Sequence, residues 1–286
     1  MVVVGVKRGW AVALFVLIVL TTVLSMFVLR PPPTENENTN KSTPSIIYGD
    51  FVAWKEVDDL FPRNAYATVR DYDSGLSFRV QRRAGTYHAD VQPLTAKDTA
   101  IMKSIYSGQW TWKRRAVLVI LDSGQILAAS MNGMPHGSGA IRGNKFNGHF
   151  CIHFRDSITH GTRSKDKAHQ VMIWKAAGVV KEQLAALQVE QAIEVVFAAI
   201  AQGDIHIAEQ FTQGEEEKGQ LLQGIPDLAW LKLQTLTAID ELHFQACVQV
   251  IKRGRTKPRA LVLNLELLQQ QPHLLISARS LLPLVQ

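Results

Sequence analysis

Histidine side chains are concentrated in one stretch of the chain, around a single cysteine. The sequence holds nine histidines, and six of them lie between residues 88 and 169. Five of the six fall within 136–169, with Cys151 among them. An imidazole can take up or release a proton near neutral pH, and a thiol beside one can become a nucleophile. The stretch therefore predicts a site built on a thiol and histidine.

The run 148–154 places three of these side chains at alternate positions. Its residues, Gly-His-Phe-Cys-Ile-His-Phe, alternate as expected of a strand, in which every second side chain points the same way. His149, Cys151 and His153 would then share one face. Such a face permits a cysteine–histidine pair, a zinc site with these three side chains as ligands, or a packed strand whose histidines bind without turnover. The residues alone leave these three interpretations open.

The other reactive side chains are given structural roles. His88 and Asp90 lie two residues apart and are interpreted as a loop pair. Cys247 lies in the apolar run Phe-Gln-Ala-Cys-Val-Gln-Val and is predicted to be a core residue. It is far along the chain from Cys151, so two free thiols are expected rather than a disulfide.

Short-range patterns predict the elements that hold the histidine cluster. Residues 115–131 read as two apolar strands joined by an Asp-Ser-Gly turn, which is a hairpin. A glycine-rich loop follows at 133–148, and 166–187 reads as one helix. Earlier in the chain, Thr95 and Asp98 have the capping-box spacing that starts a helix.

The chain beyond residue 187 reads as a small α+β domain. Residues 191–211 predict two amphipathic helices separated by a Gly-Asp turn, and strand-like runs follow at 242–251, 259–268 and 274–282. The order of these elements and the turn Ala-Ile-Ala-Gln-Gly-Asp resemble the cystatin and nuclear-transport-factor-2-like fold. An unidentified protein is the expected partner of this domain.

The N-terminal part predicts a membrane anchor. The twenty residues 10–29 carry no charge, enough for a helix of roughly 30 Å, the thickness of a bilayer core. Lys7 and Arg8 precede this run, which favours a cytoplasmic N-terminus. The proline-rich, polar stretch that follows is typical of a spacer. We therefore expect a single-pass protein of the cell membrane, with its bulk extracytoplasmic.

The overall charge favours polyanionic neighbours. The formal net charge is +6 and the pI is about 9.3. No nucleic-acid-binding motif or long basic tract is found, so nucleic acid is not an expected partner. Wall polymers and membrane lipids remain as candidate partners.

The segment around the cysteine resembles the active-site signature of the L,D-transpeptidases, the YkuD-type catalytic domain. The resemblance rests on Met-Pro-His-Gly, ending in His136 and Gly137, and on Gly-His-Phe-Cys-Ile-His, which contains His149 and Cys151. The same segments resemble bacterial wall-associated membrane proteins. The sequence departs from the family in three places. Gly148 stands where the family has serine, and phenylalanine stands where it has glycine before the cysteine. In addition, histidine stands where the family has arginine.

The resemblance implies an activity and roles for individual residues. Cys151 would attack a peptidoglycan stem peptide and form a thioester, with His136 as base and His149 beside the site, and no cofactor would be needed. The residues expected to contact the substrate are Gly137, Gly148, His153 and Arg155, the last as a replacement for the missing family arginine. The alternatives are a noncatalytic wall-binding module on the same fold and a zinc-bound hydrolase.

Together these observations predict a fold class and its boundaries. The expected order is a transmembrane helix, a mainly β, L,D-transpeptidase-like domain, and a small α+β domain. The expected boundaries are 1–9 for the cytoplasmic tail, 10–29 for the transmembrane helix, 30–45 for the linker, 46–187 for the mainly β domain and 188–286 for the α+β domain.

Overall fold

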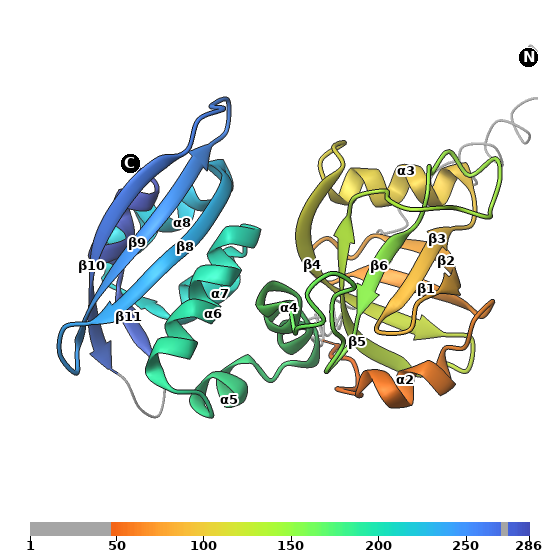
Figure 1. The fold of residues 1–286 in the computed structure, drawn as a ribbon, viewed down its shortest axis with the longest axis horizontal. Coiled ribbons are helices and arrows are strands. Elements are labelled where there is room, and N and C mark those ends of the chain that lie inside the picture. The colour runs from red at the N-terminus through yellow and green to blue at the C-terminus, as the bar shows by residue number, and fades with distance from the viewer. Residues whose placement is uncertain (1–46, 270–273) are drawn as a thin grey trace, which may run out of the picture. The chain divides into compact units, whose positions relative to one another are not determined.

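A closed barrel of six strands dominates the first part of the chain (Figure 1). The structure is a computed structural model and describes residues 47–269 and 274–286. The barrel order is β1-β2-β3-β6-β5-β4, closed by antiparallel pairing of β1 with β4. The strands are β1 (Tyr66–Asp71), β2 (Ser77–Ala84), β3 (Ala89–Pro93), β4 (Thr111–Leu121), β5 (Ile126–Gly133) and β6 (Phe150–His153).

Alternation along each strand decides what lies inside the barrel. Phe150 and Ile152 of β6 and Phe154 just beyond it belong to a fully buried apolar cluster that takes residues from every barrel strand. Since successive side chains of a strand point to opposite faces, Cys151 and His153 lie on the outer face of β6. The alternation predicted for 148–154 is therefore found over 150–154, and the strand itself begins at Phe150.

Helices accompany the barrel strands. Helix α2 (Trp54–Leu60) precedes β1, and α3 (Ala96–Ile105) follows β3. Thr95 and Asp98 form the predicted capping box at the start of α3, each side chain accepting from the other residue's backbone N–H. Helix α4 (Lys167–Ala177) packs on β4 and β5.

A second sheet and its helices form the rest of the chain (Figure 1). The sheet order is β7-β11-β10-β9-β8, with β11 parallel to β7 and the other pairs antiparallel. Its strands are β7 (Thr212–Gln213), β8 (Leu228–Ala238), β9 (His243–Lys252), β10 (Arg259–Gln269) and β11 (Leu275–Ser277). The helices are α5 (Val180–Ala185), α6 (Val189–Gln202), α7 (Ile205–Gln210), α8 (Glu215–Gly224), α9 (Ala278–Leu281) and the short 3-10 turns η1 (Ile225–Asp227) and η2 (Leu282–Leu284).

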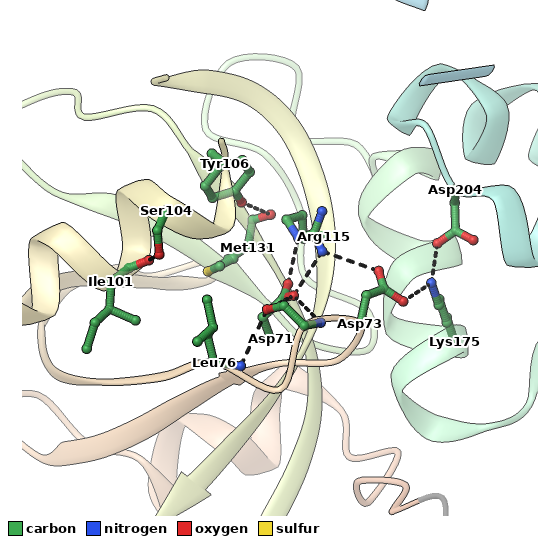
Figure 2. A network of polar contacts seen from close by, with 11 residues as sticks. Asp71, Asp73, Leu76, Ile101, Ser104, Tyr106, Arg115, Met131, Lys175 and Asp204 are labelled. Carbon is green, nitrogen blue, oxygen red and sulfur yellow. Dashed lines mark hydrogen bonds and ion pairs between the residues drawn. The ribbon is translucent and has the colours of Figure 1, made fainter. Parts of the chain in front are cut away.

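An ion-pair network joins the barrel to helix α4 (Figure 2). Arg115 of β4 donates from Nε and Nη2 to the fully buried Asp71, at 2.6 and 2.8 Å. Lys175 of α4 donates at 2.6 Å both to Asp73, after β1, and to Asp204, the N-cap of α7. Charges buried in this way are tolerated only when they are paired, so the network holds α4 against the barrel.

The expected fold class and localisation are wrong for the chain that the structure describes. The fold is mixed rather than mainly β, because α2, α3 and α4 accompany the barrel strands. Within residues 47–269 and 274–286, no helix is long and apolar enough to cross a membrane, contrary to the expected single-pass localisation. The predicted span at 10–29, with the tail and linker around it, lies outside the described residues. The boundary between 187 and 188 stays a prediction.

Several element predictions also need correction. The helix expected over 166–187 is two helices, because Gly178 ends α4 in a left-handed conformation with φ +74°. The strand expected over 274–282 is the short β11 followed by α9. Strand β8, helix α8 and the barrel strands β1 and β3 were not predicted. Cys247 lies on the outer face of β9 and is only half-buried, because its neighbours Ala246 and Val248 occupy the core face.

Candidate thiol and histidine site

The cysteine lies directly opposite a carboxylate on the outside of the barrel. Strands β3 and β6 pair antiparallel, with Asp90 and Cys151 as register partners. Ala89 and Val91 of β3 belong to the barrel interior, so Asp90 points outward, as Cys151 does. Both side chains are buried, at 6% and 5% exposure, and Cys151 Sγ lies 3.7 Å from Asp90 Oδ1.

The cysteine also contacts a histidine that a backbone carbonyl holds in place. His136 Nε2 lies 3.2 Å from Cys151 Sγ, and His136 Nδ1 lies 2.8 Å from the carbonyl oxygen of Met134. Because a carbonyl only accepts, Nδ1 carries the hydrogen in the neutral ring and Nε2 is free to accept the thiol proton. The predicted pair of His136 and Cys151 is therefore brought together, with Met134 O as the orienting third group.

Two glycines allow the loop to place its histidines. The backbones of His136 and His149 exchange two hydrogen bonds, at 2.9 and 2.8 Å, which closes the loop between them. A Cβ on Gly148 (φ +106°) would lie 2.3 Å from His136 O, and one on Gly137 (φ +60°) would lie 2.4 Å from the His149 ring. Only glycine permits both approaches, so these two residues position the histidines.

Asp90 is the centre of a second group of histidines. Its Oδ1 lies 3.3 Å from His88 Nε2, 3.6 Å from His160 Nε2 and 3.8 Å from His149 Nε2. Burial alone would raise the pKa of Asp90, but the close contact with His88 and the nearby His149 and His160 lower it to about 2. His88 and Asp90 are thus part of the site, which corrects their interpretation as a loop pair.

The imidazoles of His88, His153 and His169 form a stack, with His153 in the middle. The ring of His153 lies 4.3 Å from the ring of His88 and 3.8 Å from that of His169, both nearly parallel. His169 of α4 contacts Ser130 Oγ of β5 through Nδ1, at 2.9 Å. Burial holds the pKa of His153 and of His169 well below the usual value, so these rings are neutral and apolar in character.

The two partners of the dyad are both uncharged in this environment. Burial raises the pKa of the Cys151 thiol, and the charge of Asp90 raises it further. Burial also lowers the pKa of His136, opposed by its hydrogen bond to Met134. The resting state is therefore a thiol beside a neutral imidazole, rather than a thiolate beside an imidazolium.

The remaining predicted residues lie at varying distances from the thiol. His149 is close, with its ring 4.6 Å from that of His136. Arg155 lies over the ring of Phe51 and within 3.8 Å of Glu56, and none of its described contacts reaches Cys151.

The structure also assembles possible metal ligands. Three sets in the described chain have ligand atoms within 4.8 Å of one another: His88, Cys151 and His153; His136, His149 and Cys151; and His88, Asp90 and His160. The zinc ligands expected from the sequence, which combine His149 with His153, are not among these sets.

Sequence reasoning missed Asp90, His88 and His160 as parts of the site. The signal for the first two was present, because His-Ala-Asp-Val-Gln alternates polar and apolar residues as a half-buried strand does. Nothing in the sequence places that strand beside β6. His160 follows β6 in an irregular segment and has no periodic signal.

Comparison with known proteins does not assign the chain to a family. No family model matches it, and no curated protein or solved structure is significantly similar to it.

Proposed function

We propose that the chain is a thiol-dependent acyltransferase of the L,D-transpeptidase kind, acting on peptidoglycan stem peptides. One observation carries the proposal. Cys151 Sγ lies 3.2 Å from His136 Nε2, while the other ring nitrogen donates to a backbone carbonyl. A nucleophile, a base within hydrogen-bond reach and a group that orients the base are the parts that covalent acyl transfer needs. The resemblance of the surrounding motif to that family supplies the substrate class.

The chemistry proceeds by double displacement. His136 takes the thiol proton as Cys151 Sγ attacks the carbonyl carbon that precedes the terminal D-amino acid of the stem. The C–N bond breaks, the terminal D-amino acid leaves as an amine with the proton from His136, and a thioester remains. An amine of a second stem, or water, then loses a proton to His136 and attacks the thioester. The new bond forms and the thiol regains its proton.

The resting thiol places a condition on this mechanism. Because burial raises the pKa of Cys151, the sulfur is a protonated thiol, not a thiolate, in the resting protein. Proton transfer to His136 must then accompany attack, as general base catalysis allows. The variant that removes the base should consequently lose nearly all acylation rather than a small fraction of it.

The same burial favours a second candidate function. Cys151 is only 5% exposed, and the histidines around it are held by backbone carbonyls and by one another. A module that binds wall polymers without turnover would have such a packed strand, and would bind equally well without the thiol.

The test is acylation of the full-length protein by a stem tetrapeptide that ends in D-alanine. Intact-mass analysis should show a thioester adduct on Cys151 and release of one D-alanine. His136→Gln, which keeps a polar side chain but removes the base, should lower the acylation rate by a factor of about 100 or more. Cys247→Ser removes the other thiol, which lies half-buried on β9, and should acylate like the unchanged protein.

Two results would contradict the proposal. One is the absence of any adduct under conditions in which the protein is folded. The other is an adduct whose rate does not change in His136→Gln. If stem peptide binds with the same affinity to the protein and to Cys151→Ser, without any adduct, the binding module is the better description.

A further inference from the structure

The environment of Asp90 points to an ion rather than to hydrogen bonds alone. One carboxylate oxygen, Oδ1, has three imidazole Nε2 atoms within 3.3–3.8 Å. His88 Nε2 is buried and makes no hydrogen bond, although Asp90 Oδ1 is only 3.3 Å away. A buried polar atom of this kind requires an explanation, since the great majority of buried polar groups are paired.

The opposite ring nitrogens show which atoms carry hydrogen. His88 Nδ1 lies 2.8 Å from the carbonyl oxygen of Ile158, and His149 Nδ1 lies 2.9 Å from that of Ser138. Carbonyl oxygens only accept, so both Nδ1 atoms carry hydrogen. In the neutral rings each Nε2 then presents a lone pair toward the negatively charged Asp90, which is repulsive. A histidine that donates from one nitrogen to a carbonyl and offers the other as a lone pair is the usual arrangement of a metal ligand.

Protonating every ring is the other way to remove this repulsion. It would place imidazolium charges on His88, His149 and His160 around one carboxylate, with His88 only 1% exposed. Burying several like charges beside a single opposite one is costly. A single divalent cation satisfies the same lone pairs at once.

The spacing fits a small metal ion. Bonds of 2.0–2.1 Å in a tetrahedral site put neighbouring nitrogen and oxygen ligands about 3.3–3.4 Å apart. The separations of Asp90 Oδ1 from His88 Nε2 and from His160 Nε2 are 3.3 and 3.6 Å. All three ligand atoms lie within 4.8 Å of one another, and the side chain of His160 is 53% exposed, which leaves a route for an ion to enter.

We propose that His88, Asp90 and His160 bind one divalent first-row transition metal ion, with His149 next to the remaining position. Two imidazoles and a carboxylate are ligands for zinc-class and iron-class ions, and Zn²⁺ is the probe used here. This site does not use the sulfur of Cys151 as a ligand, and the proposal does not require the acyl-transfer chemistry. It differs from the ligand sets that contain Cys151, in which the thiol would be a ligand and could not act as a nucleophile.

The experiment is a Zn²⁺ titration of the full-length protein after treatment with a chelator and dialysis. Calorimetry should give one ion per chain, and the thermal midpoint should rise with Zn²⁺ because the ion binds only the folded state. Asp90→Asn, which is nearly isosteric, and His160→Gln, at an exposed position, should each weaken binding by about 100-fold or more, beyond the cost of losing an outer-shell partner. His206→Gln, at an exposed histidine of α7, should bind like the unchanged protein.

Cys151→Ser separates this site from the alternatives. This variant should keep its Zn²⁺ affinity within a few-fold. The unchanged protein, loaded with Co²⁺, should lack a thiolate-to-cobalt charge-transfer band. The proposal fails if no stoichiometric ion binds. It also fails if Cys151→Ser abolishes binding while His160→Gln retains it, since the ion would then lie at His136, His149 and Cys151. The acylation assay is not needed for either reading, so failure of one proposal leaves the other testable.

Discussion

A single proton decides what the thiol of Cys151 can do. Sγ has two acceptors, His136 Nε2 at 3.2 Å and Asp90 Oδ1 at 3.7 Å, and a thiol can donate to only one at a time. Donation to His136 leads toward catalysis, whereas donation to Asp90 keeps the sulfur protonated. A metal ion on Asp90 would occupy the competing acceptor. Asp90 Oδ1 therefore belongs to both proposals, as an acceptor beside the thiol and as a metal ligand, although neither proposal requires the other.

His169 makes a prediction about acid stability. Burial, followed by the charges of Arg114 and His88, holds the pKa of its ring in the folded protein well below the usual value. The ring stacks on His153 and contacts Ser130 Oγ, while the backbone N–H of His169 donates to Asp166. Below about pH 6.5 this histidine binds a proton in the unfolded state but stays neutral in the folded state, so the unfolded state binds more protons. The free energy of unfolding should therefore fall as the pH falls below about 6.5, by up to about 1.4 kcal/mol per pH unit for this ring.

Urea unfolding at pH 7 and at pH 5.5 measures this effect. His169→Gln keeps a polar group near Ser130 and should show a shallower loss of stability between the two pH values. His206→Gln, at an exposed position, should lose stability as steeply as the unchanged protein. Equal slopes in all three proteins would show that His169 does not titrate with unfolding.

At the scale of the elements, the loop between β5 and β6 depends on its glycines. Gly148→Ala would bring a Cβ to 2.3 Å from His136 O at a φ of +106°, so the paired backbones of His136 and His149 must separate. We expect a loss of about 1–3 kcal/mol in the free energy of unfolding from the strained backbone alone. Acylation of Cys151 should also be lost, because His136 would no longer be held beside the sulfur.

The matched control for this substitution is Gly143→Ala. Gly143 lies in the same loop at a φ of +77°, and a Cβ there would meet nothing within 4 Å. It should cost only about 1–2 kcal/mol for the left-handed conformation and leave the acylation rate unchanged. Equal acylation rates in the two variants would show that Gly148 does not position His136.

Local patterns in the sequence predicted local features of these elements, and little else. The alternation that buries Phe150 and Ile152 and turns Cys151 outward was readable, as was the capping box at Thr95. The spacing of His136 from Cys151 was informative only through a family resemblance. The pairing of β3 with β6 joins residues about sixty positions apart, and no local periodicity encodes it. For that reason the role of Asp90 could not be predicted.

At the scale of the whole described chain, the buried apolar residues form two separate clusters. One fills the barrel, and the other joins α4 and the outer faces of β4 and β5 to α6 and the second sheet. Residues 47–286 form one compact unit, in agreement with this shared packing. Helix α4 contributes to the candidate site as well as to the packing. Its His169 contacts Ser130 and belongs to the histidine stack, and its Lys175 lies in the ion-pair network.

Lys175 should therefore matter for stability far more than a surface lysine. It is 7% exposed and donates to Asp73 and to the buried Asp204, so Lys175→Met would leave Asp204 without its cation (Figure 2). Breaking a buried pair by removing one partner costs about 3–5 kcal/mol in the free energy of unfolding.

The control is Lys165→Met. In its pair with Asp156 the lysine side chain is more than half exposed, so the pair should contribute about 0–1 kcal/mol. Urea unfolding at neutral pH compares the two variants. If a second change, Asp204→Asn, restores most of the stability lost in Lys175→Met, the loss comes from the unpaired buried carboxylate of Asp204. If Lys175→Met unfolds at the same urea concentration as Lys165→Met, the network does not hold α4 against the barrel, and packing of the shared apolar cluster must do so alone.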